Sequence, residues 1–359
     1  MPDSERIRLV VLFGGRSAEH EVSCTSAYNV LAAADRGRYD VVPIGITREG
    51  HWVSAADAIA AGDTTATRAL PSPDGAPASA EVEPLPTVRG DRVVVLPLVH
   101  GPMGEDGTVQ GLLELAGVPY VGAGVAASAV CMDKGLAKAV LAAAGIPQCR
   151  HLSRRAADLG NADALVAEVE SSLGWPAFVK PANLGSSVGV TKVHDASELA
   201  GAIAEALRYD EYVVIEEGVT GREIEVAVLG NEAPRASVPG EIVSGREFYD
   251  YEDKYLADAA ELLVPAPLGE GEVAEVQRLA VAAYKALQVD GMARVDFFYE
   301  EGGRGWLVNE LNTIPGFTPI SMYPKLWEAS GLPYAALLDE LVRLALERHD
   351  RRQKFSNVR

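Results

Sequence analysis

Two carboxylates, an amide and a guanidinium recur at short spacing late in the chain, at Asp296, Glu310, Asn312 and Arg294. They lie in two aromatic and branched runs on either side of a Gly-rich hinge, a pattern that predicts a β-hairpin. If the hairpin closes symmetrically about Gly303, Asp296 lies opposite Glu310, and Arg294 lies opposite Asn312. Because side chains alternate between faces with period two, all four then project from the same side.

Two facing carboxylates repel each other, and a divalent cation would remove that repulsion. Asp296, Glu310 and Asn312 offer oxygen ligands only, which suits Mg²⁺ or Mn²⁺ rather than zinc. The alternative is a solvated hairpin face on which the acids pair with Arg294. The opposite face is predicted to be core, and it carries Val295, Phe297, Leu307 and Leu311.

The length, composition and net charge of the chain limit the class of protein. A chain of 359 residues predicts two or three domains, and its apolar runs are too short to span a membrane. A formal charge of −19 argues against a nucleic-acid surface, so an anionic substrate would need locally concentrated cations, a metal or helix N-termini. The N-terminus lacks a signal-peptide pattern, and the cysteines lack metal-ligand spacing, which together predict a reduced, cytoplasmic protein. These cysteines are Cys24, Cys131 and Cys149.

The N-terminal segment alternates strand and helix. Residues 9–13 and 41–46 are predicted strands around a helix at 18–34, and a Gly-Gly turn follows the first strand. This order is typical of an α/β unit with a ligand-facing turn at the carboxyl ends of its strands. Residues 54–92 are rich in Ala, Pro, Ser, Thr and Gly, and are predicted to be a surface insertion without chemistry.

The sheet is predicted to resume at 93–99. His100 begins a Gly-rich loop that leads into a helix at 108–116. The segment Tyr120–Ala127 looks like a dinucleotide fingerprint, but the acidic residue expected about 20 positions later is missing. A long helix running to Ala144 is predicted there instead, and the chain contains no P-loop motif.

Phosphate binding therefore needs another device. A predicted strand at 175–180 ends in Lys180, and the loop Gly185–Gly189 offers small residues with N–H and hydroxyl donors. The alternative for this loop is a plain Gly-Ser hairpin. The next strand, 212–217, ends in two acids that suit a hinge, and the aromatic and charged segment 247–255 is predicted to be a loop over a site.

Nine segments, in this order and at this spacing, closely resemble the D-alanine–D-alanine ligase family, a member of the ATP-grasp superfamily. The resemblance runs from about residue 7 to residue 348 and skips the 54–92 insertion. The segments are Gly14–Ser23, His100–Gly101, Gly104–Gly107, Met132–Lys134, Lys180–Pro181, Gly185–Gly189, Tyr249–Tyr255, Arg294–Asp296, and Glu310–Asn312 with Pro315–Gly316.

The resemblance implies an α/β and α+β architecture, with two ATP-grasp lobes that clamp ATP and a small α/β domain before them. The expected divisions are 1–124 for the N-terminal domain, 125–217 for the central lobe and 218–350 for the C-terminal lobe with the metal site, followed by a tail at 351–359. A homodimer is a further expectation.

The resemblance also implies roles for individual residues. Those expected to contact ATP are Lys134, Lys180, Ser187, Glu216, Glu217, Val219 and Glu223; some relatives carry Lys at position 217. Those expected to hold two Mg²⁺ or Mn²⁺ ions are Asp296, Glu310 and Asn312. Those expected to bind the two D-alanines or act in catalysis are Glu19, His100, Ser186, Lys254, Tyr255, Arg294, Gly316, Ser321 and Met322.

The implied reaction joins two D-alanines through D-alanyl phosphate, for peptidoglycan precursor synthesis. Tyr255 favours an amine as the second substrate, because relatives that make D-alanyl-D-lactate tend to have Phe there. Other ATP-grasp ligases, including D-alanine–D-lactate and D-alanine–D-serine ligases, are the nearest alternatives. A nucleotide-binding regulator built on an inactive ligase, and a dehydrogenase using residues 122–127, are more distant ones.

Overall fold

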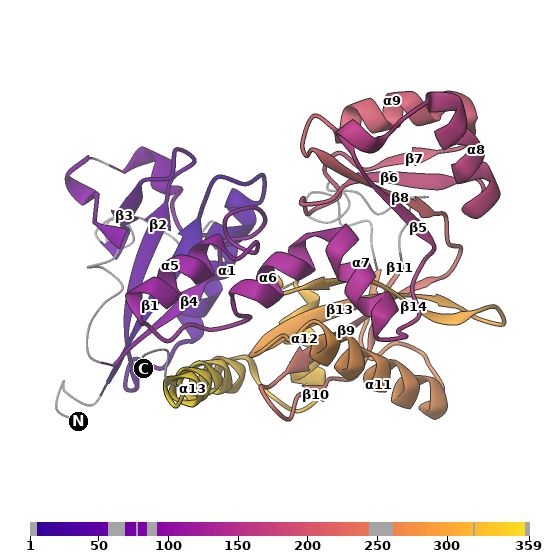
Figure 1. Ribbon diagram of the computed structural model, residues 1–359. Coiled ribbons are helices and arrows are strands. Elements are labelled where there is room, and N and C mark those ends of the chain that lie inside the picture. Colours follow the sequence, from indigo (N-terminus) through magenta and orange to yellow (C-terminus); the bar gives the residue numbers. More distant parts are fainter. Residues whose placement is uncertain are drawn as a thin grey trace.

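The structure, a computed structural model, describes residues 6–56, 69–76, 78–84, 92–243, 261–318 and 320–355. Three β-sheets organise the described chain (Figure 1), and we call them the N-terminal, central and C-terminal sheets. No helix in these ranges is both long and apolar enough to span a membrane.

The N-terminal sheet is parallel except at one edge, with the order β3-β2-β1-β4. Its strands are β1 (Ile7–Gly14), β2 (Tyr39–Ile46), β3 (Trp52–Ser54) and β4 (Val93–Pro97). Alternate residues of β1 pack on opposite layers: Leu9 joins the cluster of α1 (His20–Ala33), and Val10 joins that of α5 (Thr108–Ala116). Burial on both faces explains why these strands read as continuous apolar runs.

Part of the predicted surface insertion belongs to this fold. Residues 69–76 include buried Leu70 and Pro73, and they contain a short 3₁₀ turn, η2 (Pro73–Gly75). Ser72 Oγ lies 3.1 Å from Nε2 of the buried His20. The first residue of the predicted insertion, Ser54, is the last residue of β3, and its last residue, Arg92, directly precedes β4. The insertion also contains a second 3₁₀ turn, η3 (Ala78–Ala80).

The central sheet is antiparallel, with the order β5-β8-β6-β7. Its strands are β5 (His151–Arg155), β6 (Ala177–Pro181), β7 (Thr191–Val193) and β8 (Tyr212–Glu217). Two helices, α8 (Ala162–Ser172) and α9 (Ala196–Ala206), share its core, and η4 (Ala156–Asp158) follows β5. That core is drawn entirely from residues 152–215, so this lobe has a hydrophobic centre of its own.

The C-terminal sheet has the order β12-β11-β9-β13-β14, with β10 paired to β9. Its strands are β9 (Arg222–Leu229), β10 (Arg235–Ala236), β11 (Gly240–Val243), β12 (Glu261–Leu263), β13 (Met292–Glu300) and β14 (Gly305–Asn312). Helix α11 (Glu270–Ala286) packs in the core under this sheet.

The long helix predicted to run to Ala144 is two helices, α6 (Val125–Met132) and α7 (Lys134–Ala143). Asp133 separates them, because its backbone is extended and its carboxylate accepts the Leu136 N–H at 2.9 Å as an N-cap. Both helices contribute to the core of the C-terminal sheet (Figure 1). The predicted boundary at 125 thus assigns to the central lobe two helices that pack against the C-terminal lobe.

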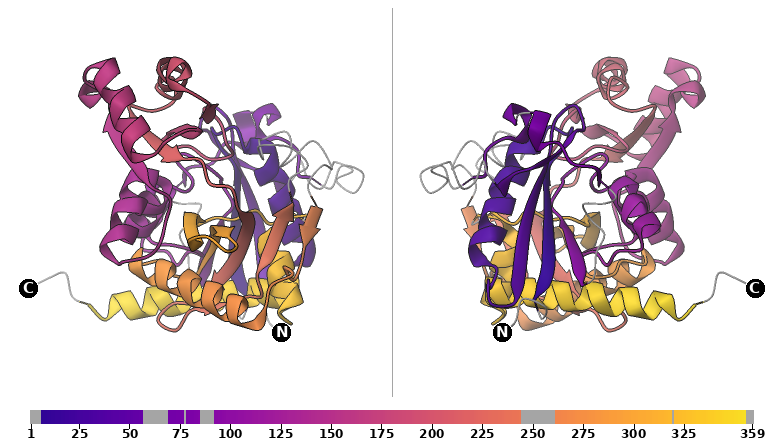
Figure 2. Two further views of the ribbon diagram at one scale, coloured as in Figure 1. Left: turned by 90° about the vertical axis from the view of Figure 1, so that its right-hand side faces the viewer. Right: turned by 90° about the vertical axis from the view of Figure 1, so that its left-hand side faces the viewer.

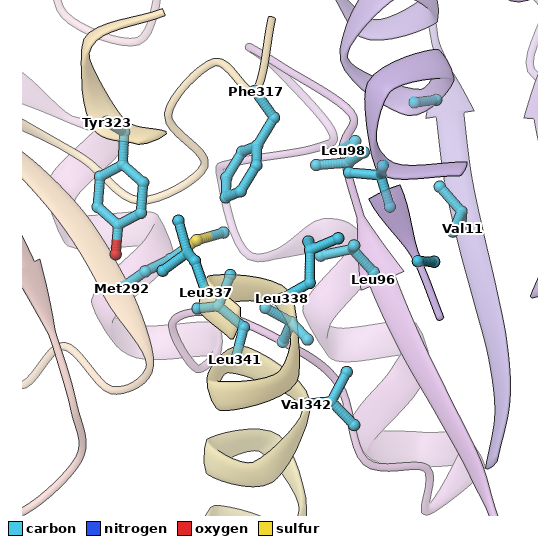
Figure 3. Packing of buried hydrophobic residues seen from close by; sticks show 14 of the residues in the cluster. Val11, Leu96, Leu98, Met292, Phe317, Tyr323, Leu337, Leu338, Leu341 and Val342 are labelled. Atoms are coloured by element: carbon cyan, nitrogen blue, oxygen red, sulfur yellow. The ribbon is translucent and has the colours of Figure 1, made fainter. Parts of the chain in front are cut away.

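The last two helices are α12 (Met322–Ala329) and α13 (Tyr334–Gln353). Helix α13 extends to Gln353, so the predicted tail at 351–359 begins within a helix. Its apolar side lies between the N-terminal sheet and the C-terminal lobe (Figures 2 and 3). Figure 3 shows this shared cluster, in which Leu337, Leu338 and Leu341 of α13 lie between Leu96 and Leu98 on one side and Phe317 and Tyr323 on the other.

Candidate functional site

The predicted hairpin register is confirmed at the four residues that matter. Strands β13 and β14 place Arg294 opposite Asn312 and Asp296 opposite Glu310. A bulge after Asp296 breaks the predicted symmetry, so Phe297 lies opposite Val308. Leu307 is buried as predicted, at 3% exposed, but the bulge sets it opposite Phe298, and Val308 takes its predicted place in the core cluster with Val295 and Phe297.

A third acid extends the pair. Glu225 of β9 lies opposite Asp296, so Glu225, Asp296 and Glu310 form a row across three neighbouring strands. Cross-strand partners project from the same face of a sheet, so the acids share it with Arg294 and Asn312. Sequence reasoning missed Glu225, because the pairing of β9 with β13 joins segments about 70 residues apart.

Arg294 lies within this row. Its guanidinium donates to both oxygens of Asp296, at 2.8 and 2.7 Å, and lies 3.0 Å from Glu225. Burial opposes its charge, but Asp296 and Glu225 outweigh that cost and raise the pKa of Arg294 well above its usual value. Asp296 therefore pairs with Arg294, as the alternative interpretation of the hairpin face predicted.

The donor set is compatible with a hard divalent cation. Within the described ranges, no group of three or more His, Cys, Asp or Glu side chains is arranged to hold a metal ion. A metal here would need the Asn312 amide as well as Asp296 and Glu310. The Asn312 amide nitrogen now donates to Asp296 at 2.9 Å, so its oxygen would have to turn toward the ion.

A cavity of about 440 Å³ opens above this face. All three lobes contribute to its walls, the N-terminal domain through Glu19 and His100 and the central lobe through Ser186. Predicted site residues that line it are Glu19, His100, Ser186, Glu223, Arg294, Asp296, Glu310, Asn312, Gly316, Ser321 and Met322. Predicted residues outside its lining are Lys134, Lys180, Ser187, Glu216, Glu217 and Val219.

The loop after β4 fixes one wall. His100 lies 3.0 Å from the Ile314 carbonyl through Nδ1, while Glu105 accepts the N–H groups of Ile314 at 3.0 Å and Gly101 at 2.8 Å. Burial lowers the pKa of His100, which favours a neutral ring. Burial, and then the charge of Glu19, raise the pKa of Glu105 to about 8. Glu105 lies in Gly104–Gly107, one of the nine segments that carry the family resemblance, but no role was predicted for it.

Glu19 connects the N-terminal domain to the central lobe. The Ser186 hydroxyl donates to its carboxylate, across 167 positions of sequence. Ser186 and Ser187 both have positive φ, at 52° and 59°, which non-glycine residues rarely adopt. The loop thus holds strained backbone at the position predicted to cover phosphate.

Close packing explains the glycine at 316. A Cβ there would lie 2.6 Å from the Ser321 hydroxyl oxygen. Ser321 in turn accepts the Thr318 N–H at 3.0 Å and precedes α12, so its side chain is held beside the first turn of that helix. Lys325, which was not predicted as a site residue, also lines the cavity from α12.

The predicted phosphate-binding lysines lie beyond Glu310. Lys134 donates to the Leu184 carbonyl at 2.6 Å, and its ammonium is 3.8 Å from Glu310. Lys180 donates to Glu216 at 2.8 Å. The structure therefore brings Lys134 next to the acidic row and places Lys180 in an ion pair.

The two acids that end β8 are buried and engaged. Glu217 accepts the Arg150 backbone N–H at 2.8 Å and pairs with the Arg150 and Arg304 guanidiniums at 2.6 and 2.5 Å. Burial opposes the ionisation of Glu217, but Arg304 and Arg150 overcome it and lower the pKa of the carboxyl. Val219 is partly exposed in the connection that follows. The side chain of Glu217 is therefore occupied, so the predicted adenine contact at 217 would have to use the main chain.

Two predicted residues lie outside the described residues, Lys254 and Tyr255, together with the loop 249–255 that contains them.

The segment that looks like a dinucleotide fingerprint, Tyr120–Ala127, makes packing contacts with other parts of the protein. The Gly122 carbonyl accepts from Arg348 of α13 at 2.5 Å, and Gly291 packs against the Gly122 backbone.

Comparisons with known proteins agree along the whole chain. The family model described as D-ala D-ala ligase N-terminus matches residues 8–123, and that described as D-ala D-ala ligase C-terminus matches residues 140–343. A D-alanine–D-alanine ligase of Thermoanaerobacter sp. (strain X514) is 47% identical over 353 residues, which cover 96% of this chain and 98% of that protein. That of Bacillus cytotoxicus is 46% identical and covers 98% of each chain.

Solved structures show the same fold. The D-alanine–D-alanine ligase of Coxiella burnetii has a TM-score of 0.81 and 39% identity, covering 98% of this chain and 97% of its own. The VanG D-Ala:D-Ser ligase of Enterococcus faecalis also has a TM-score of 0.81, with 36% identity, covering 95% of this chain and 99% of its own. The ATP-grasp fold predicted from the sequence is confirmed, and the chain belongs to the D-alanine–D-alanine ligase family.

Proposed function

We propose that this chain is an ATP-dependent ligase that joins two D-alanines through a D-alanyl phosphate intermediate. The observation that supports it most is the cavity itself, whose floor carries Asp296, Glu310 and Arg294 and whose walls bring in Glu19 and His100. A carboxylate substrate and a triphosphate are both anions, so a reaction between them requires fixed cations and positioning.

In the first step, a carboxylate oxygen of the first D-alanine attacks the γ-phosphorus, and ADP leaves. Lys134, Lys180 and the Ser187 loop bind the phosphates in this proposal, while Glu19 holds the substrate ammonium. Neutral His100, with its Nδ1 directed at the Ile314 carbonyl, orients the same substrate. Glu216, Glu217 and Val219 bind adenine, and Glu223 binds the ribose. The side chains of Glu216 and Glu217 are already paired with cations, so these two residues contact adenine through the main chain.

In the second step, the amine of the second D-alanine attacks the acyl carbon and phosphate leaves. The Arg294 guanidinium and the Gly316 N–H stabilise the tetrahedral oxyanion, and removing one such donor typically costs about 10²–10³ in rate. The hydroxyl of Ser321, the N–H of Met322 and Lys254 bind the second carboxylate. Ser186 and Tyr255 complete the link to Glu19, and closure of the 249–255 loop excludes water from the acyl phosphate.

Asp296, Glu310 and Asn312 are proposed to hold two Mg²⁺ or Mn²⁺ ions, which would neutralise phosphate charge when bound. We also propose the domain division at 124, 217 and 350, a homodimer and a cytoplasmic location; α6 and α7 fall within 125–217 in this division but pack on the C-terminal lobe.

Phosphate release from Mg·ATP, screened against individual D- and L-amino acids, tests the proposal. D-alanine is expected to support release with one dipeptide formed per phosphate. Release that does not depend on a D-amino acid, or no release with D-alanine, would contradict it.

The identity of the second substrate needs its own test, because one structural relative is a D-Ala:D-Ser ligase. With D-alanine, D-serine and D-lactate present together near neutral pH, D-alanyl-D-alanine is expected as the main product. A larger yield of ester or of D-alanyl-D-serine would show that the assignment based on Tyr255 is wrong.

A further inference from the structure

Three buried charges form a chain behind the predicted phosphate site. The ammonium of Lys138, on α7, lies 3.1 Å from one carboxylate oxygen of Glu216, and that of Lys180 lies 2.8 Å from the other. Lys138 and Glu216 are only 1% and 2% exposed. The chain also crosses between lobes, because α7 packs with the C-terminal core while Lys180 and Glu216 belong to the central sheet.

The charges of Lys138, Glu216 and Lys180 do not cancel. Lys180 and Glu216 alone would present a neutral pair to the nucleotide, because the Glu216 carboxylate would neutralise the ammonium predicted to bind the phosphates. Lys138 adds a second ammonium to the same carboxylate, so the three groups carry a net charge of +1. Interactions between charges are stronger in a buried, low-dielectric site than in water, so this extra charge is felt at Lys180.

Proton binding supports these charge states. Burial opposes the ionisation of Glu216, but Lys138 and then Lys180 outweigh it and lower the pKa of the carboxyl. Burial likewise opposes the charge of Lys180, but Glu216 raises the pKa of that ammonium. Glu216 and Lys180 are therefore both charged near neutral pH.

We propose that Lys138 is a positioning residue for the nucleotide, which acts through Glu216 to leave Lys180 with net positive charge for the triphosphate. The proposal rests on the assignment of Lys180 to the ATP phosphates. Lys138 itself is too deeply buried to be a phosphate ligand. A merely structural ammonium would stabilise the fold without distinguishing ATP from an uncharged nucleoside.

Lys138→Met removes the charge and keeps most of the side-chain volume. KM for ATP is expected to rise about tenfold, while the inhibition constant of adenosine, which has no phosphate, changes by less than about twofold. Lys138→Arg is expected to restore most of the ATP affinity. Lys285→Met, on the exposed side of α11, is the matched control and is expected to change neither value.

A double variant separates charge from folding. Lys138→Met combined with Glu216→Gln again leaves one net positive charge, on Lys180, so ATP affinity is expected to return to within about threefold of the original. This holds even if the single variant fails to fold. Equal losses for ATP and adenosine in the single variant, or no recovery in the double variant, would overturn the proposal.

The variant Lys180→Met distinguishes a failure of the role proposed for Lys138 from a failure of the proposed function. A loss of ATP affinity in Lys180→Met without any loss in Lys138→Met would overturn the role of Lys138 alone. Unchanged ATP affinity in Lys180→Met would overturn the phosphate site on which both proposals depend.

Discussion

The N-terminal and central lobes meet the C-terminal lobe through junctions of opposite chemistry. The apolar junction is the cluster shared by the N-terminal sheet, α12 and α13, in which Leu96 and Leu98 pack with Leu338 and Leu341. The polar junction joins the central lobe to its neighbours through charged or hydroxyl side chains. Its contacts are Ser186–Glu19, Lys134–Leu184, Lys138–Glu216 and Arg304–Glu217.

This difference predicts which junction moves. Separating packed apolar surfaces costs about 25 cal/mol for each Å² exposed to water, so the apolar junction should remain closed. Contacts of the polar junction that reach the surface, such as Arg304–Glu217, contribute little net stability and exchange partners with water or ligand, whereas the Lys138–Glu216 pair is buried. The central lobe, which has its own core, is therefore free to close over a nucleotide as a unit.

Glu310→Gln is expected to have the largest effect, at the point where Lys134 of the polar junction faces the acidic row. ADP release should fall by at least about 10²-fold, because the neutral side chain neither repels Asp296 nor binds a cation strongly. The free energy of unfolding should change by less than about 1 kcal/mol. Turnover and denaturation measurements check both.

Glu301→Gln, in the exposed hairpin turn, is the control for this variant and should behave as the original protein. Retained turnover with an unchanged Mg²⁺ requirement in Glu310→Gln would show that the metal assignment is mistaken.

Leu341→Ala tests the apolar junction. Leu341 is 1% exposed, and its truncation should lower the free energy of unfolding by about 2–5 kcal/mol through lost burial and a residual cavity. KM for ATP of the folded fraction should be nearly unchanged. Leu115→Ala, at a side chain that is 84% exposed, should cost less than about 0.5 kcal/mol in the same denaturation experiment.

Arg304→Gln tests the polar junction, because Arg304 joins Glu300 of its own hairpin to Glu217 of the central sheet. Stability should change by less than about 1 kcal/mol, whereas KM for ATP should rise about threefold to tenfold as the β8 end loosens. Arg343→Gln is a matched control, since Arg343 also joins two glutamates but only within α13. Equal effects of both variants on KM would contradict a role for the junction.

Glu105→Gln should have the smallest effect, and one that grows as pH rises from about 4.5 to about 8. The folded protein raises the pKa of Glu105 from 4.5 to about 8, so its contribution is fully present below the unfolded value and is lost as pH rises through 8. The variant should match the original near pH 5 and be more stable by about 1 kcal/mol above pH 8, discounted for water in the cavity. Thermal unfolding across this pH range measures the difference; parallel pH profiles would contradict it.

The acidic hairpin could be predicted from the sequence because its register depends on period-two alternation and one short turn. The bulge that exchanges Leu307 and Val308 depends on packing under the strand, which alternation does not encode. The break before α7 did have a local signal, since Asp133 is a favoured N-cap residue.

The charge partners could not be predicted in the same way. Glu216 meets Lys138 across 78 positions, and Glu217 meets Arg304 across 87, so no local pattern joins them. Both pairings follow from how the central sheet is placed beside α7 and the β13–β14 turn. Family resemblance suggested that positions 216 and 217 lie near nucleotide, but only the three-dimensional arrangement shows that their carboxylates are already occupied.

The most direct test of the two-junction account is a distance measurement between labelled cysteines. Cys24, Cys131 and Cys149 are buried, and burial raises the pKa of each thiol, so exposed cysteines introduced at Ala32, Ala204 and Glu328 should be labelled selectively. With Mg·ATP and D-alanine, the distance from Ala32→Cys to Ala204→Cys should shorten, while that from Ala32→Cys to Glu328→Cys should not change. Equal changes in both distances, or no change across the polar junction, would contradict the account.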